Sequence, residues 1–410
     1  MRSRVMEAAL TAAAAAIAVG GCGSSSSGGN GPVTLKLVAA DYGTGPKNTS
    51  QKYWQSIATA FHRANPKITV KVTTINWNNF DNQVQTMVQN HQFPDITEGD
   101  YFSQYAQQGL LYPASQVLSN TGNLLPVFKS QGSYNNTQYG MPFTTSTRTL
   151  FYNKKLFAQA HISGPPTTWA QVQADAAKIK ALGKIGFGLP LGPEEAQAEA
   201  LLWFLGDGGG YMKGSNWTIN SPQNAAALTF LKGMVNAGDT EPNPATKNRT
   251  TLWEQFAAGK IGMINGSPAL LPIIKSGGSL GPKDWGSVPI AGKTGALNST
   301  LGVCDNVAAF KQNGHQAAIK KFLDFAYQDK YQLQFVKEYQ LLPATTSASN
   351  TLKSSPTYGS FFKALPKSVQ YPSAPAWAQV KTQIQNQLGT ALSGNPSKVL
   401  SSIQQVAQKS

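Results

Sequence analysis

Carboxylates and aromatic side chains stand at the ends of predicted strands and helices along this chain of 410 residues. A carboxylate accepts hydrogen bonds from pairs of hydroxyl groups, and an aromatic face stacks on weakly apolar C–H surfaces. Together such side chains bind hydroxyl-bearing rings without covalent chemistry. The residues that form this predicted binding set are Asp41, Tyr42, Asp100, Glu195, Asp305 and Trp377.

The sequence shows no catalytic constellation. Its histidines are far apart and none has the spacing of a metal site: they are His62, His91, His161 and His315. Nucleophile elbows, phosphate-binding glycine loops and Cys-His pairs are absent from the sequence. We therefore expect no catalytic residue, no metal and no cofactor. Two carboxylates that meet in space as a glycosidase pair stay an open alternative.

Alternating strands and helices must position the binding set in the first part of the chain. The predicted strands are 33–40, 68–75 and 94–97. A helix capped by Thr49 or Ser50 follows the first strand. This alternation predicts a mostly parallel sheet with helices on both faces, in which ligands gather at the carboxyl ends of the strands. The corresponding loops are 41–45, 76–79 and 98–102.

The stretch Pro142–Phe157 predicts a crossing between two α/β regions. Residues 149–152 have the pattern of a buried strand, and Asn153 can cap the helix that follows. A second α/β region comes next, and the predicted strand 301–310 returns the chain to the first region. A hinge and a ligand cleft are expected where two such regions are joined.

This central stretch resembles the signature of the family 1 extracellular solute-binding proteins, the carbohydrate receptors of ATP-driven bacterial importers. The first part of the signature is a small residue, an apolar residue and Thr. After four variable positions, the similarity continues with residues 150–153 and Phe157. Thr149 and Gln159 depart mildly from the signature. Residues 93–111 are also similar to the family, with a Pro-Asp strand, a polar loop and a helix that ends in Gly-Leu-Leu.

The resemblance implies a two-lobe, periplasmic-binding-protein-like α/β fold. Each lobe would hold a mostly parallel sheet flanked by helices, and a hinge of several crossings would join them. The expected domains are a signal peptide at 1–21, a lipidated Cys22 and flexible tether at 22–31, an N-terminal lobe at 32–141 plus 302–342, and a C-terminal lobe at 142–301 plus 343–410.

The resemblance also suggests roles for the first members of the binding set. Asp100 falls where relatives place a sugar-binding carboxylate, and its alternative role is to cap the next helix. Asp41 and Tyr42 follow the first strand, where relatives often contact ligand. Asp41 has the alternative role of a turn residue before Gly43.

The later members have competing roles too. In relatives a Trp placed like Trp377 stacks on the sugar, and the alternative is core packing. Asp305 would face the cleft or be a buried hinge carboxylate. Relatives use an acid and an aromatic near Glu195, for which Trp203 is the aromatic candidate. Ala269 stands where many relatives carry a stacking Trp, so one expected sugar platform is missing.

The beginning of the chain predicts export. Arg2 and Arg4 precede an apolar run, residues 8–19, that is too short to span a bilayer but has the length of a signal-peptide core. Residues 19–22, Val-Gly-Gly-Cys, resemble a bacterial lipobox with lipid on Cys22; the alternative is a plain secretory signal. The glycine and serine run that follows predicts a flexible tether.

Composition narrows the classes of partner. Apolar residues make up 41% of the chain, so it can fold, but only 13% are charged, and the net charge is +15. Lys and Arg are scattered singly rather than gathered into a stripe, so we expect no nucleic-acid partner. Diffuse positive charge suits a position beside an anionic cell envelope.

These observations predict an extracytoplasmic monomer, lipid-anchored to the outer face of the cell membrane. The resemblance implies that it binds a mono- or oligosaccharide between its lobes and delivers it to an ABC permease of the cytoplasmic membrane. One alternative keeps the fold but binds a phosphorylated polyol such as a glycerophosphodiester, for which Arg148 and Lys154 are the reason. Another is a lipid-anchored glycosidase.

Overall fold

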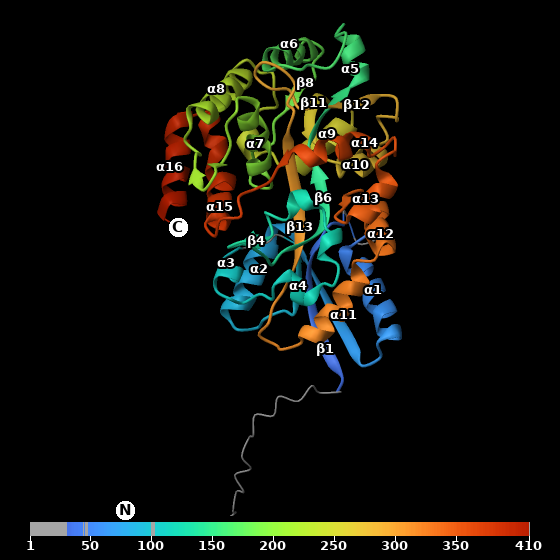
Figure 1. The fold of residues 1–410 in the computed structure, drawn as a ribbon. Helices are drawn as coiled ribbons and strands as arrows, with labels where there is room; N and C mark the ends of the chain where they lie inside the picture. The colour runs from blue at the N-terminus through green and yellow to red at the C-terminus, as the bar shows by residue number, and fades with distance from the viewer. Residues whose placement is uncertain (1–30, 44, 46–47, 100–102, 410) are drawn as a thin grey trace, which may run out of the picture. The chain divides into compact units, whose positions relative to one another are not determined.

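The structure is a computed structural model that describes residues 31–43, 45, 48–99 and 103–409. Residues Val33–Ser410 form one compact unit that contains two separate large sheets. The predicted two-lobe α/β architecture is confirmed: one sheet with its helices forms the lower part of the unit in Figure 1, and the other forms the upper part.

The first lobe is built on a seven-stranded sheet with the order β14-β6-β13-β3-β1-β2, and β15 pairs with β13. Its strands are β1 (Val33–Asp41), β2 (Ile68–Asn76), β3 (Ile96–Gly99), β6 (Met141–Thr147), β13 (Thr300–Ala309), β14 (Leu342–Pro343) and β15 (Ser368–Val369). The helices of this part of the chain are α1 (Ser50–Ala64), α2 (Trp77–Gln89), α3 (Ser103–Gln107), α4 (Ala114–Val117), α11 (Gln316–Ala326) and α12 (Asp329–Tyr339). A short hairpin pairs β4 (Ser133–Tyr134) with β5 (Thr137–Gln138).

The second lobe is built on a four-stranded sheet with the order β12-β7-β11-β8. Its strands are β7 (Thr149–Asn153), β8 (Ile185–Gly188), β11 (Ile261–Gly266) and β12 (Trp285–Val288), beside a hairpin of β9 (Met212–Lys213) and β10 (Asn216–Trp217). The helices are α5 (Lys154–Gln159), α6 (Trp169–Lys180), α7 (Ala196–Gly206), α8 (Pro222–Asn236), α9 (Arg249–Ala257), α10 (Leu270–Gly277), α15 (Trp377–Gln387) and α16 (Pro396–Lys409). Two further helices contact the first lobe: α13 (Thr346–Leu352) packs against α12 and β14, and α14 (Gly359–Ala364) against β6.

The prediction of mostly parallel sheets is wrong in its strand directions. In the first sheet β1 is parallel to β2 and β3, but β13 runs antiparallel to both β3 and β6. In the second sheet only β11 and β8 are parallel, whereas β7 runs antiparallel to β11 and β12. The reason is the crossing strands: a strand that returns from the other lobe enters the sheet from the opposite end.

One local prediction at the crossing is confirmed. Asn153 caps α5, because its side chain accepts a hydrogen bond from the backbone N–H of Leu156 at 3.2 Å. Trp169 lies in the core at the start of α6, and Cys304 is buried on β13. Thr49 occupies the predicted N-cap position of α1, but its side chain makes no capping hydrogen bond. The N–H of Ser50 donates instead to the Asp41 carboxylate at 2.8 Å.

Only Arg148 separates β6 of the first sheet from β7 of the second, so the chain crosses between lobes at this residue. Two hydrogen bonds tie the crossing to β13: the N–H of Arg148 donates to the carbonyl of Leu301 at 3.2 Å, and the Thr300 hydroxyl donates to the carbonyl of Arg148 at 2.7 Å. Figure 1 shows β6 and β13 side by side where the chain passes between the lobes. The two strands therefore support each other where the lobes meet.

Candidate functional site

The carboxyl ends of the first lobe's strands lie at one edge of its sheet. Asp41 pairs with Asn76 at the ends of β1 and β2, and Glu98 on β3 pairs with Ala39. On the other side of β3, Gly99 pairs with Asn306, so Asp305 reaches the same edge from β13. A bulge between residues 305 and 306 breaks the register there, as bulges beside functional sites often do.

Three side chains converge at this edge. The Tyr42 hydroxyl lies 2.6 Å from Oε1 of Glu98 and 3.0 Å from Oδ2 of Asp305. Burial is the main reason that the pKa values of Tyr42 and Glu98 are both raised well above their usual range. Rings of Trp77 and Phe335 pack edge-on against Tyr42. We call Tyr42, Glu98 and Asp305 the Tyr42 cluster.

The second lobe presents the matching edge of its own sheet. Gly188 at the end of β8 is next to Ile264, and Gly266 at the end of β11 pairs with Thr149 at the start of β7. Arg148, immediately before β7, therefore lies where the ends of three strands meet. The loop that follows β8 carries Glu194 and Glu195 to this edge.

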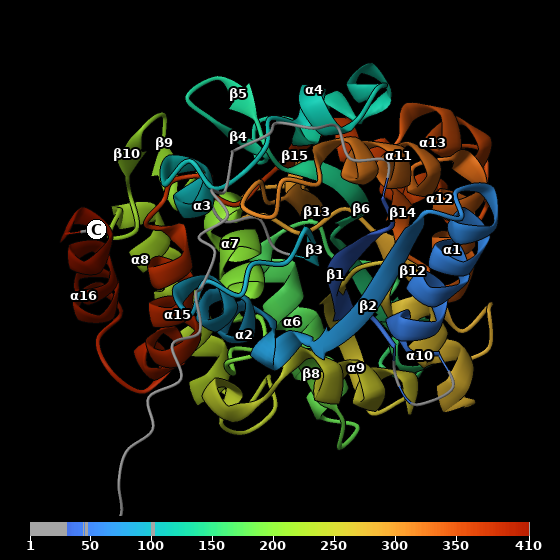
Figure 2. The same cartoon turned by 90° about the horizontal axis from the view of Figure 1, so that it is seen from below.

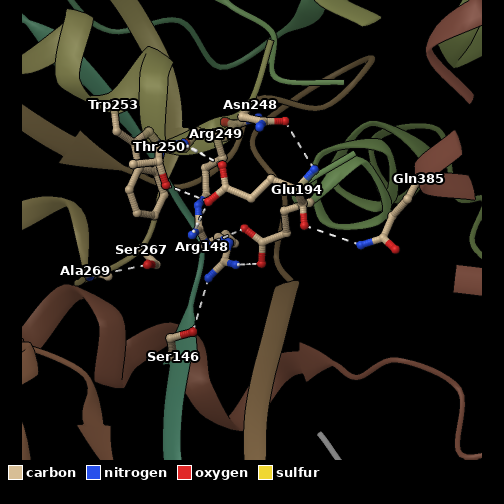
Figure 3. A network of polar contacts seen from close by, with 12 residues as sticks. Ser146, Arg148, Glu194, Asn248, Arg249, Thr250, Trp253, Ser267, Ala269 and Gln385 are labelled. Atoms are coloured by element: carbon tan, nitrogen blue, oxygen red, sulfur yellow. Dashed lines mark hydrogen bonds and ion pairs between the residues drawn. The ribbon is translucent and has the colours of Figure 1, made fainter. Parts of the chain in front are cut away.

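Two arginines and two glutamates of this edge form a closed set of ion pairs, the arginine network (Figure 3). Arg148 pairs with Oε1 of Glu195 at 2.5 Å. Arg249, at the start of α9, pairs with Oε2 of Glu195 at 2.7 Å and with Glu194 at 2.8 Å. Burial alone would raise the pKa of Glu195, but Arg148 and Arg249 outweigh it and hold this pKa below its usual range. Each formal charge in the network thus has a partner of the opposite sign.

A cavity of about 10 Å³ lies behind the arginine network, which is room for about one water-sized group. Glu199 on α7 lines it and accepts hydrogen bonds from the Trp203 indole at 2.7 Å and from the Asn265 amide at 2.9 Å. Burial raises the pKa of Glu199 to about 7. Trp203 is therefore the partner of a buried carboxyl group in the core, 3% exposed.

Trp377 begins α15 in the core of the second lobe and is 7% exposed. The ring of Tyr371 stacks on it at 5.2 Å between centroids, and Tyr211 lies 5.3 Å away. These contacts support the core-packing role that the sequence left open. Its role as a sugar platform stays a prediction.

The other members of the binding set have different outcomes. Asp41 has the turn role, because its Oδ1 accepts from the N–H groups of Gly43 and Ser50. Tyr42 and Asp305 are brought together, whereas Glu195 lies on the other lobe within the arginine network. Asp100 and Cys22 lie outside the described residues.

Lys154, which the sequence grouped with Arg148, follows the opposite end of β7. A strand rises by about 3.3 Å per residue, so the backbones of these two residues are roughly 20 Å apart. Lys154 cannot share an anion with Arg148, and Arg148 itself is paired with Glu195.

Sequence reasoning placed Glu98 in an expected ligand loop but not in the binding set, and it missed Arg249 and one ion pair between the lobes. Lys381 on α15 lies 2.6 Å from Asp81 on α2, although 300 positions separate them in the chain. Ala378, also on α15, packs against the apolar cluster beneath α2. Both views show α15 beside α2 (Figures 1 and 2). No local signal marks such a pair, because each residue alone is an ordinary charge on a helix.

We predict that Lys381→Met shifts the unliganded protein toward a more open arrangement of its lobes. The Lys381 side chain is 10% exposed and that of Asp81 33%, so the pair is worth up to about 1 kcal/mol. That energy corresponds to a change of about fivefold in the ratio of open to closed molecules. Small-angle scattering should report a larger radius of gyration.

Lys293→Met is the matched control, because Lys293 pairs with Asp207 at 3.0 Å within the second lobe. It should leave the radius of gyration unchanged. Equal scattering from Lys381→Met and the unmodified protein would show that this pair does not hold the lobes together.

Two further observations concern the described residues alone. No group of three or more His, Cys, Asp or Glu side chains among them could hold a metal ion. None of the helices in this part of the chain is at once long and apolar enough to cross a bilayer.

Comparison with known proteins matches residues 56–363 to the family described as bacterial extracellular solute-binding protein. A Brucella abortus binding protein is 26% identical over 379 residues, which cover 89% of this chain and 90% of that protein. The diacetylchitobiose binding protein of Streptomyces coelicolor is 25% identical over 80% of this chain and 78% of its own. The sn-glycerol-3-phosphate-binding periplasmic protein of Brucella melitensis is 26% identical over 62% of this chain and 61% of its own.

Solved structures share the fold. An ABC transporter solute-binding protein of Thermotoga lettingae, bound to α-D-tagatose, superposes with a TM-score of 0.80. It is 20% identical in sequence, and the match covers 92% of this chain and 99% of that one.

Proposed function

The chain belongs to the bacterial extracellular solute-binding protein family, and from this we propose that it binds a neutral sugar between its lobes, closes around it and delivers it to an ABC importer. The observation that carries the proposal is the pairing of charges at the edge of the second lobe. Arg148 and Arg249 are compensated by Glu194 and Glu195, so this edge offers a polar surface without excess charge. A ligand rich in hydroxyl groups suits such a surface.

The first lobe would supply the complementary acceptors. Asp305 is 9% exposed at the edge of its sheet, and Tyr42 contacts it there. A ligand that touches both lobes binds the closed arrangement better than the open one and shifts the population toward it. Closure of this kind is the signal that a permease would read. The similarity to a diacetylchitobiose binding protein supports a sugar as the ligand class.

The rest of the proposal concerns location and partners. Cys22 would carry the lipid that holds the protein at the outer face of the cell membrane, and the run after it would act as a tether. The lobes would be 32–141 with 302–342 and 142–301 with 343–410. The protein would act as a monomeric receptor without catalysis, beside an ABC permease of the cytoplasmic membrane.

A thermal-shift screen against sugars, polyols and phosphorylated polyols tests the ligand class. A sugar at a hundred times its dissociation constant should add about 2.7 kcal/mol of stability. Asp305→Asn should weaken that sugar about tenfold or more, because a hydrogen bond to a charged group is worth about 1.5–3 kcal/mol. Asp324→Asn, a change at a partly exposed residue of α11, is the control and should not affect affinity. Unchanged affinity in Asp305→Asn would place the sugar elsewhere.

A phosphorylated polyol is the second candidate, because a relative that binds sn-glycerol-3-phosphate matches 62% of this chain. Its binding would weaken steeply with added salt, whereas that of a neutral sugar would not. If only phosphorylated compounds raise the melting temperature, this candidate replaces the first. Release of a product from an oligosaccharide would instead indicate a glycosidase.

A further inference from the structure

The Tyr42 hydroxyl has one hydrogen but contacts two carboxyl groups. It lies 2.6 Å from Oε1 of Glu98 and 3.0 Å from Oδ2 of Asp305, both within hydrogen-bond distance. Two ionised carboxylates are acceptors only, so a single phenol hydrogen cannot satisfy both. One of the two carboxyl groups must therefore supply a second hydrogen.

Burial decides which group carries it. Glu98 is fully buried, whereas Asp305 is 9% exposed. Oε2 of Glu98 is enclosed, and no described residue lies in full hydrogen-bond geometry with it. The Trp54 indole and the backbone N–H of Ala40 lie near the carboxyl group and favour its ionised form, but burial opposes that form more strongly. An unpartnered carboxylate oxygen costs far more in such a place than the carbonyl oxygen of a neutral acid.

No cation of the described residues is among the groups that act on Glu98. The groups of the described residues that face it are Tyr42 before α1, Tyr53 and Trp54 on α1, Asp305 on β13, Tyr327 after α11 and Tyr339 on α12. Tyr53 and Tyr327 donate elsewhere, to the backbone carbonyls of Tyr331 and Met141. Tyr42 is thus the one of these phenols that lies within hydrogen-bond distance of Glu98.

We infer that Glu98 is a neutral carboxylic acid that donates its hydrogen to the Tyr42 oxygen, so that the Tyr42 hydrogen is directed to Asp305. Glu98 is then a positioning residue. It acts through Tyr42 to fix the orientation of Asp305, which we propose accepts from the hydroxyl groups of the sugar. This functional part of the inference rests on the proposed function, whereas the position of the hydrogen does not.

Infrared spectroscopy of the whole protein tests whether the Glu98 carboxyl group carries a hydrogen. A protonated carboxylic acid has its own carbonyl stretch, separate from that of a carboxylate. At about pH 8.5 this band should persist in the unmodified protein, because Glu199 and Glu241, with pKa values of about 7, are then mostly ionised. Glu98→Gln should remove the band, and Glu241→Gln and Asp305→Asn should retain it. Loss of the band in Asp305→Asn instead, or its absence from the unmodified protein, would overturn the assignment.

Stability gives a second readout that needs no ligand. Burial raises the pKa of Glu98 in the folded state, so the unfolded state ionises first as the pH rises. The folded protein therefore loses stability above the unfolded pKa of about 4.3. Glu98→Gln cannot ionise and should melt at a higher temperature than the unmodified protein at neutral pH. This difference should disappear below about pH 4; a difference that is constant with pH would contradict the inference.

The functional part is tested with the sugar that gives the largest shift in the thermal screen. Glu98→Gln can still donate to Tyr42 and should bind within about threefold of the unmodified protein. Glu98→Leu and Tyr42→Phe remove the hydrogen bonds that link Glu98 through Tyr42 to Asp305. Both variants should bind the sugar about tenfold or more weakly. Equal binding by all three would overturn the positioning role and leave the infrared result standing. Failure of every sugar would count against the proposed function alone.

Discussion

Replacing Arg148 with Met should lower the free energy of unfolding by about 3 kcal/mol, toward the lower end of what broken buried ion pairs cost. Arg148 is 5% exposed and its partner Glu195 is 14% exposed, so water cannot replace the lost contact. The lower end applies because Arg249 still pairs with Glu195 after the change. Equilibrium urea unfolding should show a lower midpoint with an unchanged slope.

Two comparisons make this result specific. Lys155→Met removes an exposed pair with Asp284, whose side chains are 55% and 25% exposed, and should cost less than about 1 kcal/mol. Arg148→Met leaves one arginine against two glutamates, whereas the double variant Arg148→Met with Glu195→Gln leaves Arg249 paired with Glu194 alone. The double variant should therefore be more stable than Arg148→Met, because the network carries no excess negative charge. If Arg148→Met and Lys155→Met cost the same, the arginine network is not a buried structural unit.

The stability that Arg148→Met loses should depend on pH. The pKa of Glu195 is held below its usual range in the folded protein, so its pairing stabilises the fold above the unfolded pKa. That stabilisation is lost as the pH falls through the lowered folded pKa. The difference between the unmodified protein and Arg148→Met should therefore narrow in acid.

Trp377→Ala should lower the free energy of unfolding by about 3–5 kcal/mol, the range for a large aromatic side chain removed from a core. Trp377 is 7% exposed, and the rings of Tyr371 and Tyr211 pack against it, so its removal leaves a cavity beside α15. Thermal and urea unfolding of the unliganded protein both measure this loss. A variant that melts like the unmodified protein would contradict the core role.

Trp217→Ala is the comparison for Trp377→Ala, because Trp217 stacks on Trp377 from a partly exposed position at the second lobe's hairpin. It should cost clearly less stability. Trp377→Phe keeps most of the packing and separates the two roles. If its sugar affinity is unchanged, Trp377 packs the core only, and if affinity falls while stability holds, its ring is also a sugar platform.

Much of the fold could be predicted because its signals are local. The pattern of apolar residues predicted β1 and β2. Asn153 could be recognised as a cap from its position after a strand alone. Strand direction could not be predicted in this way, because it depends on how often the chain returns from the other lobe.

The site was predicted less well for the same reason. Asp41 and Tyr42 were found because they follow a strand, but their roles depend on Ser50, Glu98 and Asp305. Glu98 was placed only at the start of a loop expected near the ligand, and Arg148 was considered only as a cation for a phosphorylated ligand. Their partners lie 56 and 47 positions away in the chain, beyond the reach of any local pattern.

The sequence by itself determined the class of this protein: an α/β chain with a central crossing, a family signature around it, and a beginning that predicts export. Such features depend on a few neighbouring residues, whose propensities and caps act within one strand or one helical turn. Only the tertiary structure decided which charges are compensated, which tryptophans are covered and which carboxyl group must keep its proton. These properties depend on burial and on contacts such as Tyr42 with Asp305 and Asp81 with Lys381, which are 263 and 300 positions apart in the chain and meet only in the folded protein.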